Sequence, residues 1–370
     1  MANRAGLAIG VILVIAIVAV AAYMIAGRGA PTETATPSPT TTATPAATET
    51  TSPAAAAKVT IRWGTSRTGS SGYRALSTLA SLVSQEMPEI EITVVPTAGA
   101  VASMKAFARG EVDACYAADI GFREMYSFTG RFEGFKPEAK RMPLQTLWVY
   151  TIDIGIAVPK DKADQFKCWR DFDGKKIFTL PMGWDTGTAL RLGLDTLGVK
   201  YEHVELDLDA VATALQRGDI VATGIYVTGG RSIAPWAQQL LAQMDLVIVN
   251  PCPDEIEKLK AAGIPLGESP TSPAFPKDVG TDKLIGVRIY YGFHTGTNID
   301  EETVYKLIKF VERNAKKLAE IDPAYSQIAE DFLGFQVEAV NAAKFVPLHP
   351  GLAKYLKEKG VWNEEWKVGG

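Results

Sequence analysis

Three short segments rich in Gly, Ser and Thr each separate a strand-like run from a helix-like run: residues 65–73, 97–103 and 185–188. Small side chains let a ligand approach the backbone closely. Free amide groups at the start of a helix favour a bound anion. In open α/β sheets such loops line a crevice at the carboxyl ends of the strands. The three segments therefore predict a binding site for a small anion.

The expected ligand contacts are hydroxyl and backbone groups from two halves of the chain. Tyr73 offers an apolar wall together with a phenolic donor, and Gly187 would let the backbone approach the ligand closely. Arg231 lies near the proposed loops, as do Arg67 and Arg74. The predicted ligand-binding residues are Thr68, Ser70, Ser71, Tyr73, Ala100, Ser103, Asp185, Thr186, Gly187, Thr188, Tyr226 and Arg231.

Catalytic chemistry has little support in the sequence. No glycine-rich loop is followed by Gly-Lys-Ser/Thr, none has the spacing of a dinucleotide fingerprint, and no Gly-x-Ser-x-Gly elbow occurs. The histidines His203, His294 and His349 lie far apart, which argues against a zinc site of the local-motif kind. His294 is the best candidate base, but we expect it to pack in or beside a strand, and His349 to make a structural hydrogen bond. We therefore predict no catalytic residues, no metal and no cofactor.

The composition is that of an ordinary globular protein. The chain has 370 residues, 47% hydrophobic and 22% charged, with a formal net charge of −4. This length suits roughly two domains, and the charge argues against nucleic acid as a partner. Three cysteines allow at most one intrachain bridge. Cys115 is expected to be buried, whereas Cys168 and Cys252 either pair or stay free.

Strands alternate with helices through the folded part, which predicts an α/β fold with a largely parallel sheet. Residues 59–63 and 90–95 alternate as strands do, and the helix between them has apolar residues at helical spacing. The order recurs at residues 176–180, the loop 183–188 and the helix 189–197. Residues 106–114 resemble residues 214–222. In each segment a helix ends at Arg-Gly and a strand follows. Two related halves or a coincidence would both produce it.

Two apolar stretches are expected to connect these halves. Residues 144–158 suit one strand in the first lobe followed by one that crosses into the second, and residues 284–299 would return the chain. The closing region 301–366 is predicted to be helical, with one stripe of core residues. We expect two α/β lobes joined by two crossovers, with a ligand cleft between them. Lobe 1 would comprise residues 58–152 and 292–370, and lobe 2 residues 153–291.

The N-terminal region predicts a tether. Residues 7–26 are uncharged and mostly apolar, between Arg4 and Arg28, and are about as long as a bilayer's hydrocarbon core requires. They favour an uncleaved transmembrane anchor (residues 1–28), with a cleaved signal peptide as the alternative. Residues 29–57 are rich in Thr, Pro and Ala, so we expect a disordered stalk. Anchor and stalk would place the remaining chain outside the cytoplasm, at the cell surface or in the periplasm.

In the Gly/Ser/Thr-rich loops and at its C-terminal end, the sequence resembles the TAXI-type extracytoplasmic solute receptors of tripartite ATP-independent periplasmic (TRAP) transporters. The most specific piece is the closing Pro-x-His-Pro-Gly-x-x-x-Tyr-x-x-x-Lys-Gly motif, and the match extends in order over residues 58–370. Gly72 replaces the first of two tandem tyrosines of the family, and Ala100 and Ser103 replace its Ser and Asn. The matching segments are residues 64–73, 97–103, 110–119, 171–175, 186–188 and 347–360.

This resemblance implies a two-lobed periplasmic-binding-protein fold of type II. The lobes of such a receptor would close around a small organic anion or amino acid, such as glutamate or 2-oxoglutarate. The receptor would deliver its ligand to a TRAP membrane permease driven by an ion gradient. The alternatives are an ABC-type receptor, which the closing motif argues against, or an extracellular enzyme on the same two-lobed fold. A surface sensor or adhesion module is a further alternative, although no signalling domain is evident in the sequence.

Overall fold

The computed structural model describes residues 58–370, all of which lie in one compact unit, Ala56–Gly370. The predicted anchor (residues 7–26) and stalk (residues 29–57) lie outside the described residues. Between residues 58 and 370, no helix combines the length and apolar character needed to cross a bilayer.

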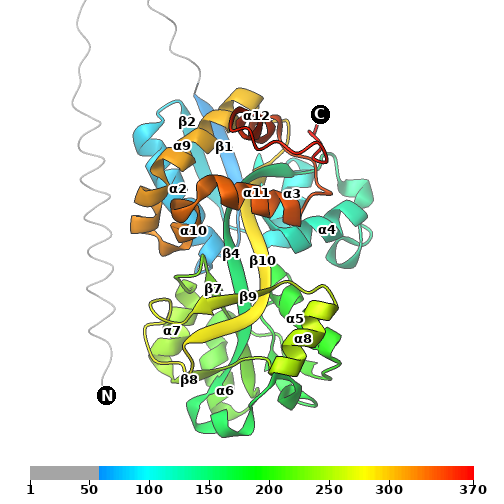
Figure 1. Ribbon diagram of the computed structural model, residues 1–370, viewed down its shortest axis with the longest axis vertical. Helices are drawn as coiled ribbons and strands as arrows, with labels where there is room; N and C mark the ends of the chain where they lie inside the picture. The colour runs from blue at the N-terminus through cyan, green and yellow to red at the C-terminus, as the bar shows by residue number, and fades with distance from the viewer. Residues whose placement is uncertain (1–57) are drawn as a thin grey trace, which may run out of the picture. The chain divides into compact units, whose positions relative to one another are not determined.

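The described strands form one mixed sheet in the order β2-β1-β3-β10-β4-β7-β5-β6, with β8 paired to β4 and β9 to β10 (Figure 1). The β1, β2 and β3 pairings are parallel, as are those of β5, β6 and β7, but β4 and β10 pair antiparallel to their neighbours. The sheet is therefore less parallel than predicted, because the chain crosses between the lobes in both directions. The strands are β1 Val59–Gly64, β2 Ile90–Val95, β3 Ala114–Ala118, β4 Leu144–Pro159, β5 Lys176–Phe178, β6 Glu202–His203, β7 Ala222–Thr228, β8 Leu246–Val249, β9 Leu266–Pro270 and β10 Lys283–Thr295.

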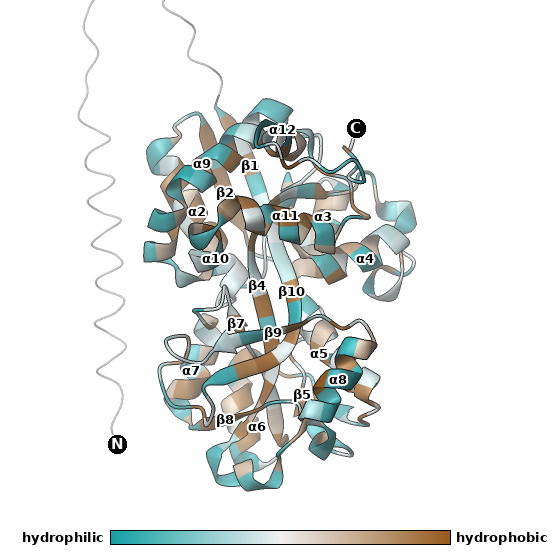
Figure 2. Ribbon diagram, in the orientation of Figure 1, coloured by the Kyte–Doolittle hydropathy of each residue, from teal (hydrophilic) through white to brown (hydrophobic). Residues whose placement is uncertain are grey.

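Helices cover this sheet in both lobes (Figure 1). In α9 the predicted core stripe is buried, from Val304 to Leu318. Figure 2 shows hydrophobic colour along β4 and hydrophilic colour on much of α8 and α9. The helices are α2 Ser71–Glu86, α3 Ala100–Arg109, α4 Asp119–Ser127, α5 Asp185–Leu197, α6 Val211–Arg217, α7 Pro235–Gln243, α8 Pro253–Ala261, α9 Glu301–Ile321, α10 Ser326–Glu330, α11 Phe332–Ala342 and α12 Pro350–Glu358.

Two long strands run through both lobes. In lobe 1, the end of β10 pairs with β3 through Tyr291–Thr295, whereas in lobe 2 its beginning pairs with β9. Every residue of β4 is buried, and the strand continues without a break where two successive strands were expected. Pairing with β10 on one side and β7 on the other satisfies its backbone across the crossing point. The two predicted crossovers are confirmed, and the lobe boundaries 58–152 with 292–370 and 153–291 remain our proposal.

The similarity between residues 106–114 and 214–222 has a structural basis. Gly110 ends α3 and Gly218 ends α6, each in the left-handed conformation, with φ of 83° and 78°. Each glycine N–H donates to two carbonyls of the last helical turn. Glycine adopts this conformation without a Cβ penalty, which explains why both helices stop there.

A buried ion pair lies where β4 and β10 cross into lobe 2. The Asp153 side chain is 1% exposed, and Arg288 Nε and Nη2 donate to its two oxygens at 2.7 and 2.8 Å. Ser269 Oγ donates a third hydrogen bond at 2.6 Å. A side chain at position 267 would overlap this carboxylate, because an added Cβ would lie 1.9 Å from Asp153 Oδ1. The glycine and the ion pair thus belong to one packed unit.

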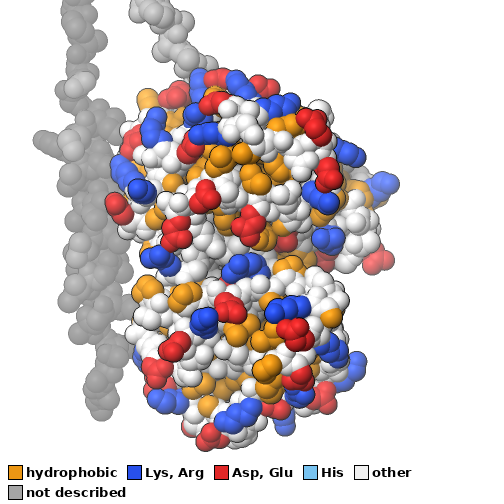
Figure 3. Space-filling model, in the orientation of Figure 1, with side chains coloured by type: hydrophobic (Ala, Val, Ile, Leu, Met, Phe, Trp, Pro, Cys, Tyr) orange, Lys and Arg blue, Asp and Glu red, His pale blue; other side chains and the backbone are white. Residues whose placement is uncertain are grey.

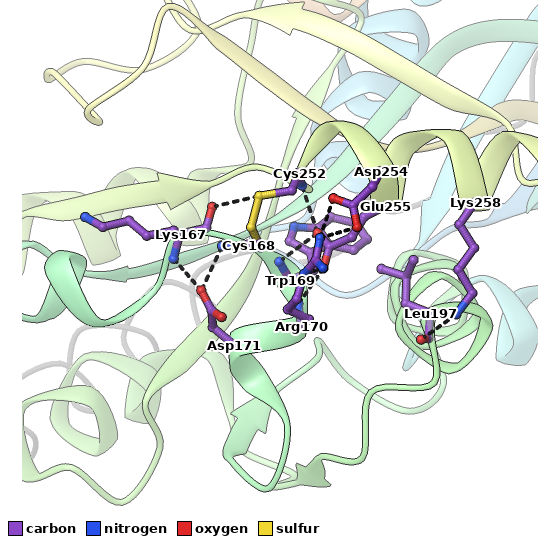
Figure 4. Close-up of polar contacts among 10 residues, drawn as sticks. All are labelled: Lys167, Cys168, Trp169, Arg170, Asp171, Leu197, Cys252, Asp254, Glu255 and Lys258. Atoms are coloured by element: carbon purple, nitrogen blue, oxygen red, sulfur yellow. Dashed lines mark hydrogen bonds and ion pairs between the residues drawn. A yellow bond between two sulfur atoms is a disulfide. The ribbon is translucent and has the colours of Figure 1, made fainter.

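Cys168 and Cys252 form a disulfide, which the sequence had left open. Cys168 precedes a short 3₁₀ turn, Trp169–Phe172, and Cys252 caps α8 (Figure 4). Beside the bridge, the buried Glu255 carboxylate accepts hydrogen bonds from the backbone amides of Trp169, Arg170 and Cys252. The bridge therefore joins two segments of lobe 2 that also share a carboxylate. Cys115 is buried, as predicted.

Candidate functional site

A small cavity lies between the two lobes. Its volume is about 10 Å³, which is close to the space that one water molecule needs. On the face drawn in Figure 3 the two lobes meet with acidic and basic side chains interspersed over both. The cavity is lined by Ser66, Ser70, Ser71, Gly72, Ala100, Tyr116, Ile152, Trp184, Thr186, Tyr226 and Tyr291.

Three helices begin at this cavity: α2 and α3 from lobe 1 and α5 from lobe 2. Ser70 caps α2 and accepts a hydrogen bond from the Tyr73 amide at 3.1 Å. Gly99 and Trp184 cap α3 and α5 without any side-chain hydrogen bond. Amides in the first turn of a helix have no partner within the helix, and the helix dipole is positive there. The convergence of three such ends favours a negatively charged group in the cavity.

Thr186 adds an unpaired hydroxyl to these amides. The residue is 2% exposed and lines the cavity, and its Oγ1 has no hydrogen-bond partner. A buried hydroxyl without a partner is costly. A ligand that accepts a hydrogen bond from Thr186 would remove this cost.

Aromatic rings form the remaining walls. Tyr116 and Tyr291 stack with centroids 4.5 Å apart and planes 8° from parallel. Tyr116 shares a hydrogen bond with the Tyr150 hydroxyl at 2.9 Å, and the Tyr226 hydroxyl accepts from Trp236 Nε1 at 3.2 Å. Burial raises the pKa of Tyr226 to about 12 and that of Tyr116 and Tyr291 well above the ordinary value, so these phenols are neutral. The lining residues have no carboxylate to repel an anion.

Direct contacts hold the lobes together around the cavity. Ser71 Oγ and Thr228 Oγ1 lie 2.9 Å apart and share a hydrogen bond. The Trp184 indole donates to the Ala98 carbonyl at 3.0 Å, and the backbone amide of Trp236 donates to the Gly69 carbonyl at 3.3 Å. The structure is thus a closed form, whose cavity has room for about one water molecule.

The structure brings some of the predicted ligand-binding residues to this cavity. Ser70, Ser71 and Ala100 line it from lobe 1, and Thr186 and Tyr226 from lobe 2. Residues 185–188, which were expected to form a loop, are the first turn of α5. The segment therefore reaches the cavity as a helix start.

Four other predicted residues, Ser103, Asp185, Gly187 and Thr188, do not line the cavity. Ser103 Oγ accepts from the Tyr116 amide at 3.0 Å. Asp185 forms an ion pair with Arg131, and the Thr188 hydroxyl accepts from Arg191 at 3.2 Å. At Gly187 an added Cβ would lie 2.8 Å from the Pro181 carbonyl oxygen, so the glycine is needed for packing. These side chains position the cavity's walls.

The remaining predicted residues lie outside the cavity. Thr68 is exposed. Tyr73 faces a separate open groove of about 510 Å³, which Arg74 and Pro235 also line. Arg231 is exposed and pairs with Glu330 at 2.7 Å. Thr68 and Tyr73 belong to the loop segment 65–73 and Arg231 follows Gly230, but none of the three lines the cavity.

Several lining residues were missed by sequence reasoning. Tyr116 and Tyr291 lie in apolar strands, where nothing in the sequence separates a cavity wall from core. Trp184 directly precedes the predicted segment 185–188, so its position was the available signal. Gly72 packs against Tyr116: an added Cβ would lie 2.6 Å from that ring. The Tyr116 ring occupies the space that a side chain at position 72 would need.

The two histidines of interest have structural roles. His294 lies in β10, fully buried, as predicted, and its Nδ1 accepts a hydrogen bond from the Thr146 amide at 3.1 Å. Its ring packs edge-on against Phe122 and Trp148. His349 caps α12, and its Nδ1 accepts from the Gly351 amide at 3.1 Å. Neither histidine lines the cavity.

Acid is expected to destabilise the protein through His294. Burial lowers the pKa of His294 from 6.5 to about 3. As pH falls below 6.5, His294 takes up a proton in the unfolded chain but stays neutral in the folded protein. The free energy of unfolding therefore falls by about 1.4 kcal/mol per pH unit. Urea unfolding from about pH 6 to pH 4 measures this slope. His294→Asn should make it shallower by about one proton, and an unchanged slope would contradict the assignment.

Cys168, Cys252 and Glu255 lie close enough to hold a metal ion, but their chemistry does not fit one. Both sulfur atoms belong to the disulfide, and a metal needs thiolates. The Glu255 carboxylate already accepts three backbone hydrogen bonds and one from Arg170 Nε at 3.1 Å. The disulfide and the Glu255 carboxylate therefore have a structural role: they join the Trp169–Phe172 turn to the start of α8 (Figure 4).

Comparison with known proteins gives one family match. The model of the NMT1-like family matches residues 63–360. Similar solved structures include the alkanesulfonate-binding protein SsuA from Xanthomonas axonopodis pv. citri bound to MOPS (16% identity, TM-score 0.42, 85% of this chain and 98% of that chain). The periplasmic aliphatic sulphonate binding protein SsuA from Escherichia coli has 15% identity and a TM-score of 0.42, over 81% of this chain and 84% of that chain. A putative L-cystine ABC transporter protein from Listeria monocytogenes has 12% identity and a TM-score of 0.41, over 73% and 96%.

Proposed function

The chain belongs to the NMT1-like family, and on this premise we propose that it is an extracytoplasmic solute-binding protein that captures a small organic anion by lobe closure. The observation that supports the ligand class best is the convergence of three helix N-termini on one uncharged cavity. Family membership and the absence of a nucleophile–base pair among the lining residues both favour a receptor without catalytic activity.

The anion would be held by amides and hydroxyls instead of by an arginine. Each charge-assisted hydrogen bond of this kind contributes about 1.5–3 kcal/mol. Because α2 and α3 belong to lobe 1 and α5 to lobe 2, the complete set exists only when the lobes are together. Binding therefore shifts the population towards a closed, liganded form. A carboxylate or an amino acid such as glutamate has the required charge.

A membrane permease is the proposed partner. The sequence motifs, above all the closing segment 347–360, favour a TRAP-type permease, and the TAXI class is the finer assignment we propose. An ABC-type system would hydrolyse ATP, whereas a TRAP-type system uses an ion gradient. Uptake by cells that produce the receptor, measured with an ionophore that collapses the gradient, separates the two systems.

An oxidising compartment is consistent with the Cys168–Cys252 bridge, since such bridges are rare in the cytosol. We propose that residues 7–26 tether the receptor to the membrane and that residues 29–57 act as its stalk. Both segments lie outside the described residues, and their sequence supports this role.

Thr186→Val is expected to weaken ligand binding about tenfold, which corresponds to one hydrogen bond. The substitution preserves shape and removes the unpaired hydroxyl of the cavity. A thermal-shift screen of small carboxylates, amino acids and sulfonates first identifies a ligand, and calorimetry then measures its affinity for both proteins.

Thr188→Val is the matched control, two positions along the same helix. Its hydroxyl accepts from Arg191 and does not line the cavity, so the ligand's affinity should stay close to that of the unchanged protein. Equal affinity in all three proteins would place the ligand elsewhere. A screen in which no anion raises the melting temperature would contradict the ligand class.

A further inference from the structure

A carboxylate of lobe 2 is buried inside lobe 1. Asp185 is the first residue of α5, and its side chain is fully buried. Its Oδ1 lies 2.7 Å from Arg131 Nη2, and its Oδ2 accepts a hydrogen bond from the Ala118 amide at 3.2 Å. Arg131 and Ala118 both belong to lobe 1. The contact therefore spans the cleft and exists only while the lobes are closed.

Lobe 1 is shaped to receive this carboxylate. Arg131 lies in a short 3₁₀ turn, Gly130–Phe132, and is held from its other side by Glu124 of α4 at 2.6 Å. Gly121 of α4 leaves the space that the carboxylate fills, since an added Cβ there would lie 3.0 and 3.1 Å from its two oxygens. A backbone amide, a guanidinium and a glycine thus form one carboxylate pocket.

We propose that Asp185 is an internal latch, a carboxylate of lobe 2 that docks into this pocket of lobe 1 and holds the receptor closed when no solute is bound. Asp185 does not line the cavity, whose volume of about 10 Å³ excludes any organic solute. Its role therefore differs from the ligand contact that the sequence suggested. The latch depends on the two-lobed fold and not on the identity of the ligand.

The latch affects the proposed binding function by competition. A closed, empty conformer has no room for a solute, so the fraction of protein held in it does not bind. Apparent affinity falls in proportion to the open fraction. A solute must hold the lobes further apart than they are here, so its contacts must outweigh those of the latch. This favours ligands that engage all three helix starts.

The two partners of the latch should differ when each is removed. A buried ion pair that loses one partner leaves an uncompensated charge, and that is strongly unfavourable. Arg131→Gln leaves the Asp185 carboxylate buried in lobe 1 without its cation, so the lobes should open. Asp185→Asn is milder, because Arg131 keeps Glu124 and the asparagine is neutral. Combining the two substitutions should open the lobes less than Arg131→Gln alone.

Distances between spin labels on the full chain, measured without added solute, test the latch. Glu133→Cys in lobe 1 and Leu192→Cys in lobe 2 give two exposed labelling sites, while Cys115 is buried and the other cysteines are bridged. We expect one short distance population in the unchanged background. A longer population should dominate in Arg131→Gln, be minor in Asp185→Asn, and shrink again in the double variant.

Arg109→Gln is the matched control, because Arg109 pairs with Glu138 at 2.6 Å within lobe 1. It should leave the distances unchanged. The absence of a longer population in both Arg131→Gln and Asp185→Asn overturns the latch, as does equal lengthening in Arg109→Gln. If circular dichroism shows that Arg131→Gln is unfolded, Asp185→Asn decides alone. Because no solute is present, the latch and the ligand proposal fail independently.

Discussion

Replacing both Cys168 and Cys252 with serine is expected to lower the free energy of unfolding by about 2–4 kcal/mol. The two residues are 84 positions apart, so the bridge removes much of the freedom of the unfolded chain. The bridged segments also share Glu255, whose buried carboxylate would lose its partners if they moved apart. Urea unfolding of the two proteins under oxidising conditions measures the difference.

Reductant provides the control for this result. A reducing agent should bring the unchanged protein to the stability of the Cys168→Ser, Cys252→Ser double variant and should leave the variant itself unaffected. Equal stability of the oxidised protein and the variant would show that lobe 2 does not depend on the bridge.

Asp153→Ala is expected to cost about 3 kcal/mol of stability, because it removes one partner of a buried ion pair. Arg288 would lose its only buried carboxylate contact among those described, and Ser269 would lose its acceptor. The Arg288 side chain is 26% exposed and can reach solvent, so the expected cost is at the lower end for such pairs. Urea unfolding at neutral pH provides the measurement.

An ion pair on the surface provides the control for this prediction. Asp245→Ala removes the contact with Lys277 at 2.9 Å, where both side chains are largely exposed. Exposed pairs contribute less than about 1 kcal/mol. If Asp153→Ala cost no more than Asp245→Ala, the ion pair at the crossing would not stabilise the sheet.

Much of the fold follows from local pattern. Strand alternation, helical stripes and the glycines at positions 110 and 218 predicted the elements where they are found. The antiparallel course of β4 was not predictable, because an unbroken apolar run has no period that reveals its partner or its length. Tyr291 illustrates the same limit at the site: only the register of β10 against β3 brings it beside Tyr116.

The part of the candidate site that could be predicted from the sequence is the part built from helix N-termini. The positions of Ser70, Ala100 and Thr186 could be predicted because each lies at a helix N-terminus. Small residues in the sequence indicate where these helices begin. Tyr73 and Thr188 were misplaced because a helix turns each successive side chain by about 100°, and the starting angle is set by tertiary packing. The pairing of Asp185 with Arg131 joins residues from different lobes, so no local pattern contains it.

The two strands shared by the lobes also constrain the order in which this protein can fold. The last residues of β10 complete the sheet of lobe 1, and the Thr295 hydroxyl reaches the Asp113 carbonyl across 182 positions of sequence. A chain that emerges N-terminus first therefore holds β1, β2 and β3 without their neighbour until all of lobe 2 has been made. Such late, distant pairing slows folding and leaves a strand edge open to other chains. Lobe 2 is continuous in sequence and can assemble before that edge is closed.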